Sequence, residues 1–420
     1  MIFESFTGAQ WALLLGTFGI ALVMGALVNK TNFCTMGAVS DWVNMGDTGR
    51  LRAWIFAIAI ALLGVSGLEY LGLVDATHSF PPYRSSQLIW AENLIGGILF
   101  GIGMTLGSGC GNKTLIRIGG GNIKSVLVML AIGVIAYFMV NPFPGSDQTL
   151  MSILFYDWLR PAAVSLPTNQ DLGSLVAPEQ AAPLARLLIG GAIGIAILVW
   201  VFRSADFRGN RDNILGGAIV GMAVLAAWVL SSNLYVDADG ETYTLKAYAE
   251  NWDFLADSPE GKPADTRPLS PQSFTFVNPM GQVLGYAARG FDSTYLTFGI
   301  MALLGVIVGS FVYAVFSGNF RIEWFASVRD FVNHLVGGIL MGFGGVLAVG
   351  CTIGQGVTGL STQAVGSVIA YAGIVFGSAM TMKVQLYRMV YEDASLADVL
   401  LTALADLRLL PGTMRRLEAV

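Results

Sequence analysis

The chain has 420 residues, of which 54% are hydrophobic and only 12% are charged, and its net charge is −5. Soluble domains carry about 25% charged residues, so this chain has too few charges to cover the surface of a soluble fold. A nucleic-acid-binding protein would need a basic face, and a disordered chain would need low hydrophobicity. Both classes are excluded, and the composition predicts an all-α polytopic membrane protein.

Nine hydrophobic stretches are candidates for membrane-spanning helices, each of which needs about 20 apolar residues. In chain order they are residues 10–28, 54–73, 93–109, 125–140, 187–200, 214–231, 294–317, 333–350 and 364–382. Residues 331–382 contain no Asp, Glu, Lys or Arg. That stretch is too long for one span, so it predicts two crossings around a re-entrant turn.

The positions of Lys and Arg predict the orientation, because cytoplasmic loops collect these residues. With the N-terminus outside, the inner segments hold 16 of them and the outer segments hold six, with Arg186 at an outer helix end. The C-terminus is then cytoplasmic. Three regions follow: a membrane transport domain at 1–382, a polar extracytoplasmic insert within it at 233–292, and a cytoplasmic tail at 383–420. The tail is expected to be an amphipathic helix or a solvated segment.

Two segments form an internal repeat, LIGGILFGIGMTLGSGC at 94–110 and LVGGILMGFGGVLAVGC at 335–351, with ten of seventeen positions identical. In the predicted topology the copies cross the membrane in opposite directions. Inverted-repeat transporters have this property, and their substrate sites lie near the midplane where the halves meet. Each copy also carries two glycines one helical turn apart, which permits close helix packing. These are Gly97 and Gly101 in the first copy, and Gly338 and Gly342 in the second.

The three cysteines, Cys34, Cys110 and Cys351, each end a glycine-bearing hydrophobic stretch and precede a predicted break in the helix. Broken backbone is tolerated at membrane depth only where it is buried in protein or lines a cavity. The half-helix that follows each break would aim N–H groups at an anion. Three soft thiols in this setting predict a path for a sulfur-containing or similarly soft anion. The residues expected to support that path are Thr35, Gly37, Gly109, Gly111, Asn112, Gly350, Thr352, Gly354 and Gln355, with Lys30, Lys113 and Arg117 as candidate charges at the inner mouth.

Other interpretations of the polar residues make different predictions. If the cysteines merely pack, as buried thiols commonly do, alanine at all three positions would leave transport intact. No metal site is expected, since the chain lacks a Cys-x-x-Cys motif and ligand spacing around His78 and His334. No cofactor, ATP motif or enzymatic activity is predicted. Glu69, near the outer end of the second span, is a candidate for proton coupling or a carboxylate that reaches the interface.

Four motifs carry a family resemblance: GCTIGQG at 350–356 with GLS at 359–361, GCG at 109–111, NFCTMG at 32–37 and FTFVNPMG at 274–281. They closely resemble the YeeE/YedE family of bacterial sulfur-compound transporters, particularly its YeeE thiosulfate-uptake branch. The resemblance implies thiosulfate import across the bacterial inner membrane, through an hourglass of membrane helices and half-helices with three cysteines along its central path. It also implies a small TusA-like sulfur-carrier protein as a cytoplasmic partner. Because the family has a selenium branch, another sulfur or selenium compound stays open as the substrate.

Thiosulfate is a dianion, so a path of thiolates would repel it. The hypothesis is therefore that neutral thiols pass the ion between weak, successive sites, with Cys351 nearest the outside, Cys110 nearest the inside and Cys34 also on the inner half. The alternative is a membrane sulfurtransferase, in which a cysteine attacks the sulfane sulfur and carries a persulfide. Against it, no His or carboxylate lies beside any cysteine in the sequence to act as a base.

Overall fold

A computed structural model describes residues 1–238, 240–254 and 267–418 of the chain. Within these residues nine helices are long and apolar enough to cross a membrane. They are α1 (Phe6–Thr31), α3 (Gly49–Tyr70), α4 (Trp90–Leu106), α6 (Ile123–Val140), α9 (Ala182–Phe202), α11 (Arg211–Ser232), α14 (Phe298–Phe316), α15 (Val328–Leu347) and α16 (Val365–Val390). Each coincides with one predicted span, so the prediction of an all-α polytopic membrane protein is confirmed.

Shorter helical segments connect the long helices. The α-helical ones are α2 (Thr35–Ser40), α5 (Gly111–Gly119), α7 (Asp157–Leu159), α8 (Leu172–Val176), α10 (Ala205–Gly209), α12 (Leu245–Glu250), α13 (Val277–Ala288) and α17 (Leu396–Asp406). Three are π-helical, η1 (Asp41–Met45), η2 (Ser152–Tyr156) and η6 (Gly354–Gly359). Single 3₁₀ turns are η3 (Arg160–Ala162), η4 (Trp252–Phe254), η5 (Ser293–Tyr295) and η7 (Gly412–Met414). Among them, α2, α5 and η6 follow the three cysteines.

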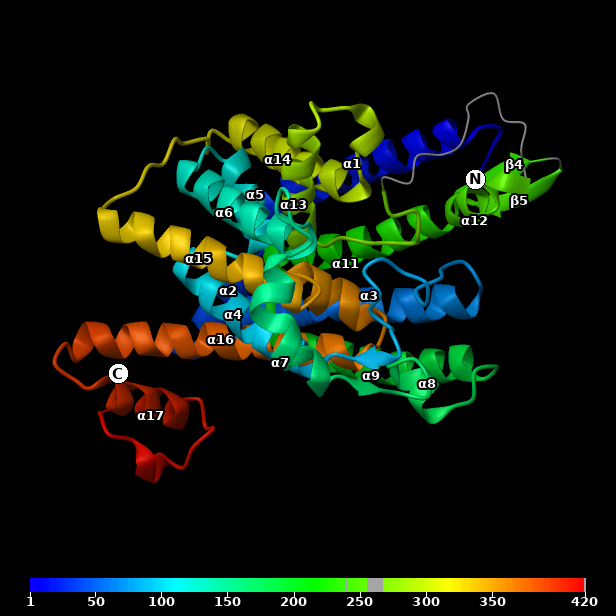
Figure 1. Cartoon of the computed structure of the whole chain (residues 1–420). Coiled ribbons are helices and arrows are strands. Elements are labelled where there is room, and N and C mark those ends of the chain that lie inside the picture. Colours follow the sequence, from blue (N-terminus) through cyan, green and yellow to red (C-terminus); the bar gives the residue numbers. More distant parts are fainter. Residues whose placement is uncertain (239, 255–266, 419–420) are drawn as a thin grey trace.

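Short strands join the loops at one end of the helix bundle. The N-terminal strand β1 (Ile2–Phe3) pairs in parallel with β4 (Tyr235–Ala238), which pairs antiparallel with β5 (Glu241–Thr244). Elsewhere β2 (Gln87–Leu88) pairs antiparallel with β3 (Val164–Ser165). The N-terminus and the β4–β5 hairpin lie at the opposite end of the bundle from α17 (Figure 1). These two ends are called the N-terminal face and the C-terminal face below.

The two repeat helices, α4 and α15, pack directly against each other in opposite directions. A Cβ atom added at Gly96 would lie 2.5 Å from the nitrogen of Ala348, and one added at Gly103 would lie 2.6 Å from the carbonyl oxygen of Gly337. As the residue number rises along α4, the number of the contacting residue in α15 falls, so the two helices are antiparallel. Antiparallel packing of repeated helices is the relation that an inverted repeat requires.

The predicted glycine pairs of the repeat lie at helix contacts, as close-packing glycines should. Gly101 faces the backbone of α16, where an added Cβ atom would lie 2.7 Å from the nitrogen of Ser378. In the second copy, Gly338 and Gly342 face α6, and an added Cβ atom at either position would lie 2.7 Å from a side chain of that helix. The glycines of the repeat thus allow α4 to pack closely against α16 and α15 to pack closely against α6.

Part of the segment predicted as a polar insert packs against the long helices. Phe274 and Phe276 are fully buried and stack with their ring centroids 6.1 Å apart. They lead into α13, whose first residue, Val277, packs 2.5 Å from where a Cβ atom at Gly345 would lie. The predicted limit at residue 292 averaged this apolar run with the acidic residues before it. Other parts of the insert, residues 239 and 255–266, lie outside the described residues.

The C-terminal tail also differs from its predicted boundary, because α16 continues through Lys383 to Val390. After a turn, α17 folds back beside α16 at the C-terminal face (Figure 1). Asp406, the last residue of α17, accepts a 2.5 Å hydrogen bond from the Tyr387 hydroxyl and pairs with Lys383 at 3.4 Å and with Arg415. The tail therefore has a specific anchor on the protein, and only residues 419–420 of it lie outside the described residues.

Candidate functional site

The three cysteines follow the same backbone turn. Two residues before each cysteine, a non-glycine residue adopts the left-handed conformation, with φ of 51° at Asn32, 57° at Ser108 and 60° at Val349. At the two repeat copies the next residue closes a Schellman motif, since Gly109 N–H donates to the Met104 carbonyl at 2.9 Å and Gly350 N–H to that of Gly345 at 2.8 Å. A β-branched residue such as Val349 is an outlier in this conformation, and such strain clusters at functional sites.

Each cysteine also begins a new helical segment. The carbonyl oxygen of Cys34 accepts from Ala38 N–H at 3.0 Å, that of Cys110 from Thr114 N–H at 2.9 Å, and that of Cys351 from Gln355 N–H at 2.7 Å. The cysteine is therefore the first residue of the segment to accept a helical hydrogen bond. Free backbone N–H groups at such starts favour negative charge. One of them is used already, because Gly354 N–H donates to the Cys351 sulfur at 3.4 Å.

The structure brings the three thiols into one buried chain. Cys34, Cys110 and Cys351 are 5%, 1% and 0% exposed, and all three are free thiols. Cys110 interacts electrostatically with both of the others. The order of the three cysteines between the outside and the inside stays a prediction. Gly111, directly after Cys110, lies beside Cys351, since a Cβ atom added there would be in ordinary contact, 3.9 Å from Cβ of Cys351.

Buried polar atoms with unused hydrogen-bonding capacity follow each cysteine. They are Thr35 Oγ1 after Cys34, Asn112 Oδ1 after Cys110, and Thr352 Oγ1 and Gln355 Oε1 after Cys351, with Thr275 Oγ1 opposite Gly354. The Thr352 hydroxyl interacts with the Cys110 thiol. Buried polar groups are normally satisfied, so these atoms have hydrogen-bonding capacity that the described residues do not use.

The predicted glycines around the cysteines have distinct contacts. Gly37 makes room for the guanidinium group of Arg50, and Gly354 makes room for Thr275. Gly109 and Gly350 lie beside side chains in the first turn of the next helical segment, those of Lys113 and Gln355. Side chains at these positions would push the cysteine turns away from their neighbours.

Positive charge gathers beside Cys34 and Cys110. Lys113 donates to Asn32 and interacts electrostatically with both thiols, while Arg117 donates to the Ser108 carbonyl at 2.7 Å. Lys30 is exposed near the end of α1. The sequence interpretation missed Arg50, which pairs with Asp41 and also acts on Lys113. In the described part of the chain, no group of three His, Cys, Asp or Glu could hold a metal ion.

Aromatic residues that the sequence interpretation missed flank the thiols. Tyr83 interacts electrostatically with Cys351, and its buried hydroxyl lacks a hydrogen-bond partner. Tyr371 interacts in the same way with Cys110 and stacks on Trp54 at a centroid distance of 6.3 Å. No local sequence pattern indicates either tyrosine, because each comes close to a cysteine only in the folded protein.

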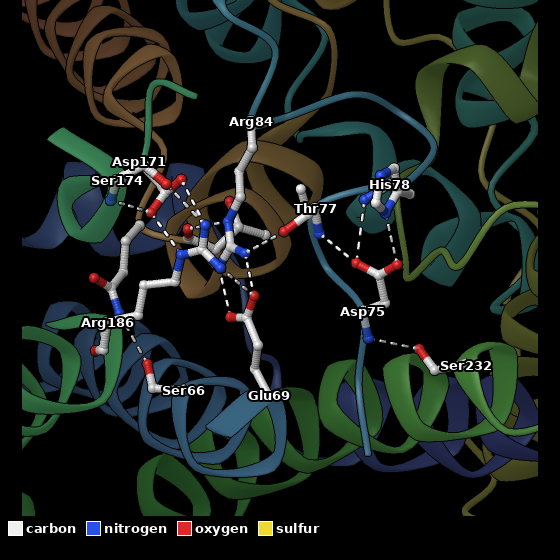
Figure 2. Close-up of polar contacts among 12 residues, drawn as sticks. Ser66, Glu69, Asp75, Thr77, His78, Arg84, Asp171, Ser174, Arg186 and Ser232 are labelled. Atoms are coloured by element: carbon white, nitrogen blue, oxygen red, sulfur yellow. Dashed lines mark hydrogen bonds and ion pairs between the residues drawn. The ribbon is translucent and has the colours of Figure 1, made fainter. Parts of the chain in front are cut away.

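A buried network of charges supports the segment after Cys351 (Figure 2). Glu69 pairs with both Arg84 and Arg186, at 2.8 Å for Arg84 Nη2 and Arg186 Nη1. Arg186 Nε donates to Asp171 at 2.7 Å, and Arg84 Nε donates to the Thr362 carbonyl at 2.9 Å. Glu69 is therefore the centre of an ion-pair network, and neither a free proton-coupling group nor a carboxylate that reaches the interface.

The pKa of Asp171 reflects its hydrogen bonds and its neighbouring charges within this network. Burial raises the pKa of Asp171, but the hydrogen bonds from Arg186 and Ser174 and the charge of Arg84 outweigh it, so that this pKa lies below its ordinary value of 3.8. Its carboxylate is fully buried, with 0% of the side chain exposed. The network thus joins two guanidinium groups and two carboxyl groups in the protein interior.

A family model described as sulphur transport matches residues 30–380, which include all three cysteines. The thiosulfate transporter TsuA of Escherichia coli K12 is 25% identical over 362 residues, covering 83% of this chain and 88% of that protein. TsuA of Spirochaeta thermophila is 23% identical over 382 residues, covering 88% and 98%. The probable transporter YedE of Salmonella typhimurium is 28% identical over 118 residues, 26% of each chain.

Proposed function

The chain belongs to the sulphur transport family, and from this premise we propose that it imports thiosulfate across the bacterial inner membrane. Two relatives named as thiosulfate transporters align with most of the chain. The observation that carries the proposal is the row formed by Cys351, Cys110 and Cys34, with an unsatisfied polar atom after each thiol. Soft thiols suit the sulfane sulfur of thiosulfate, and the polar atoms suit its oxygens and water.

The proposed orientation places the N-terminal face outside and the C-terminal face in the cytoplasm. The charges support it: Lys113, Arg117 and Arg50 lie beside the thiols that precede α2 and α5, and cytoplasmic ends of membrane helices are enriched in positive charge. The proposed direction of transport is then from Tyr83 and Cys351 toward Cys110 and Cys34. A small TusA-like sulfur carrier would collect the sulfur at the C-terminal face.

The proposed mechanism is a relay between weak sites. A dianion would be repelled by thiolates, so each thiol remains neutral and offers an S–H donor. The other backbone N–H groups at the starts of the helical segments share the charge of the ion. Several weak sites in series allow passage, whereas one strong site would trap the ion.

The test is uptake of ³⁵S-labelled thiosulfate into cells that lack other sulfate and thiosulfate importers. Cells expressing the protein should take up the label with saturation, and cells carrying an empty vector should not. Unlabelled thiosulfate should compete at lower concentration than selenium oxyanions. If the protein confers no uptake of thiosulfate, the proposed substrate is wrong. If a selenium oxyanion competes better, the substrate belongs to the selenium compounds.

A sulfurtransferase remains the alternative function, because the Gly354 N–H that points at the Cys351 sulfur could also stabilise a thiolate. In that reaction the thiolate attacks the sulfane sulfur, a new S–S bond forms, the S–S bond of thiosulfate breaks, and sulfite leaves with its electron pair. Mass spectrometry of protein incubated with thiosulfate distinguishes the two functions. The transport proposal predicts three unmodified cysteines, while a persulfide on Cys351 would support the alternative.

A further inference from the structure

A cavity of about 270 Å³ lies between α6, α13 and the loop before α14. One face of α13 forms most of its wall, with residues at helical spacing: Asn278, Gly281, Gln282, Gly285, Tyr286 and Arg289. The facing wall includes Tyr137 and Asn141 of α6, and Tyr295 and Thr297 before α14. Phe80 of the loop after α3 also lines it, and that loop lies at the N-terminal face because Asn233 contacts both Leu73 and Met1.

This cavity is separate from the thiols. Met280 lies on the face of α13 opposite to the lining residues, since it is two positions from Asn278 and Gln282. Its terminal methyl group would be 3.8 Å from a Cβ atom added at Gly111, directly after Cys110. Helix α13 thus contacts the thiol turns with one face and borders the cavity with the other.

The charge of the cavity is positive. Arg289 is the only charged residue among the described residues that line it. Its guanidinium group lies over the ring of Tyr295, 4.5 Å from the ring centroid, and no carboxylate of the described residues pairs with it. A guanidinium group without a carboxylate partner presents its N–H groups to a phosphate in a geometry that fits two oxygens at once.

Neutral donors lie beside this arginine. The Gln282 oxygen accepts from the Thr297 hydroxyl at 2.6 Å, which leaves the amide N–H groups of Gln282 to donate into the cavity. Asn278 and the hydroxyls of Tyr286 and Tyr295 add further polar groups to the lining. At roughly 30 Å³ per water molecule, the cavity is too large for a single small ion and has room for a larger polar group.

An exposed apolar stripe leads away from the cavity along α6. Leu130, Val134, Tyr137 and Asn141 are spaced four, three and four residues apart, so they lie on one face of the helix. Tyr137 and Asn141 line the cavity, whereas Leu130 and Val134 are 54% and 42% exposed. With a rise of 1.5 Å per residue, the stripe begins about 5 Å from Tyr137 and extends to about 10 Å. A molecule with its polar end in the cavity could therefore lay an apolar chain on this stripe.

From these observations we propose that the cavity binds an anionic phospholipid, with the phosphate on Arg289 and an acyl chain along Val134 and Leu130. Basic pockets between membrane helices bind anionic lipid head groups, and tyrosines are enriched at the level of those head groups. The amide of Gln282 donates to the glycerol hydroxyls of the head group. This site is independent of the proposed function, because none of the cysteines lines it.

The experiment is the melting temperature of the purified full-length protein in dodecyl maltoside with a rising fraction of dioleoylphosphatidylglycerol. The lipid should raise the melting temperature of the wild type, and Arg289→Gln should need a roughly tenfold higher lipid fraction for the same rise, because it loses a charge-assisted bond to the phosphate. Arg321→Gln is the control, since Arg321 is an exposed arginine that does not line the cavity. It should respond like the wild type.

Two further probes separate the lipid from other ligands. Dioleoylphosphatidylcholine, whose ammonium group cancels the charge of its phosphate, should have little effect, and an equal rise with this lipid would overturn the preference for an anionic head group. Sodium phosphate without lipid should also have little effect, and a full rise with it would show that the site takes a free ion. Equal responses of the wild type and Arg289→Gln would refute the site. Native mass spectrometry of the wild type should retain phosphatidylglycerol in preference to phosphatidylcholine, and equal retention would contradict the proposal without relying on any variant.

Discussion

Replacing Glu69 by Gln should destabilise the protein strongly, because it removes the charge at the centre of a buried network. The Glu69 carboxylate pairs with three guanidinium N–H groups, two from Arg84 and one from Arg186. The side chains of Glu69, Arg84 and Arg186 are 8%, 0% and 7% exposed. Gln preserves the volume of the side chain, so the change tests the charge and not the packing.

The expected cost follows from what each arginine retains. Arg186 keeps its bonds to Asp171, whereas Arg84 keeps only the Thr362 carbonyl and the Thr77 hydroxyl. Removing one partner of a buried ion pair costs 3–5 kcal/mol, and the lower end, about 3 kcal/mol, applies where neutral acceptors remain. At 1.36 kcal/mol per factor of ten, the folding equilibrium should fall by roughly 150-fold.

The assay is equilibrium unfolding of the purified protein in mixed micelles with increasing SDS. Glu179→Gln is the matched control, since Glu179 is an exposed carboxylate beside the same network. The control should unfold with the wild type, and Glu69→Gln should unfold at a clearly lower SDS fraction. Coincident curves for Glu69→Gln and Glu179→Gln would show that the network contributes no stability and would refute the reasoning.

Three further predictions concern helix packing, pH and the tail. Gly101→Val should lower the free energy of unfolding by about 1–3 kcal/mol, because the added side chain overpacks against α16. Gly19→Val, at a position with no neighbour within 4 Å, should lower it far less. Thermal melts of the two variants in detergent test this difference. The pKa of Asp171 is depressed in the folded protein. The ionised carboxylate therefore stabilises the fold fully above about pH 4, and this stabilisation disappears as pH falls through the folded pKa. Asp171→Asn should accordingly lower the melting temperature more at pH 7 than at pH 3. Asp406→Ala should free α17, and limited proteolysis should then cut the tail faster than in wild type; equal rates would contradict the anchor.

The membrane spans could be predicted from sequence because hydropathy is a property of each segment by itself. Ser327 and Asn122, for example, lie directly before the helices that the apolar runs indicated. The cysteine motifs could also be found in the sequence, because a repeated pattern of residues can be detected without a structure. The burial of Phe274 within the predicted insert could not be predicted from composition, because a short apolar run disappears in the average of its acidic neighbours.

The geometry of the site could not be predicted, for two physical reasons. The left-handed turns before the cysteines occur at Ser108 and Val349, where sequence rules expect Gly. Only the surrounding packing can impose that conformation on a valine. The partners of Glu69 lie 15 and 117 residues away in the chain, and no local pattern reports a contact over such a separation.

The central claim is that the ion passes along three thiols. The most direct measurement is the initial rate of labelled thiosulfate uptake by the wild type and by Cys34→Ala, Cys110→Ala and Cys351→Ala at matched expression. A relay in series predicts that each single variant loses most of the uptake, because every ion must pass all three thiols. Wild-type rates in all three variants would show that the cysteines only pack, and would contradict the account.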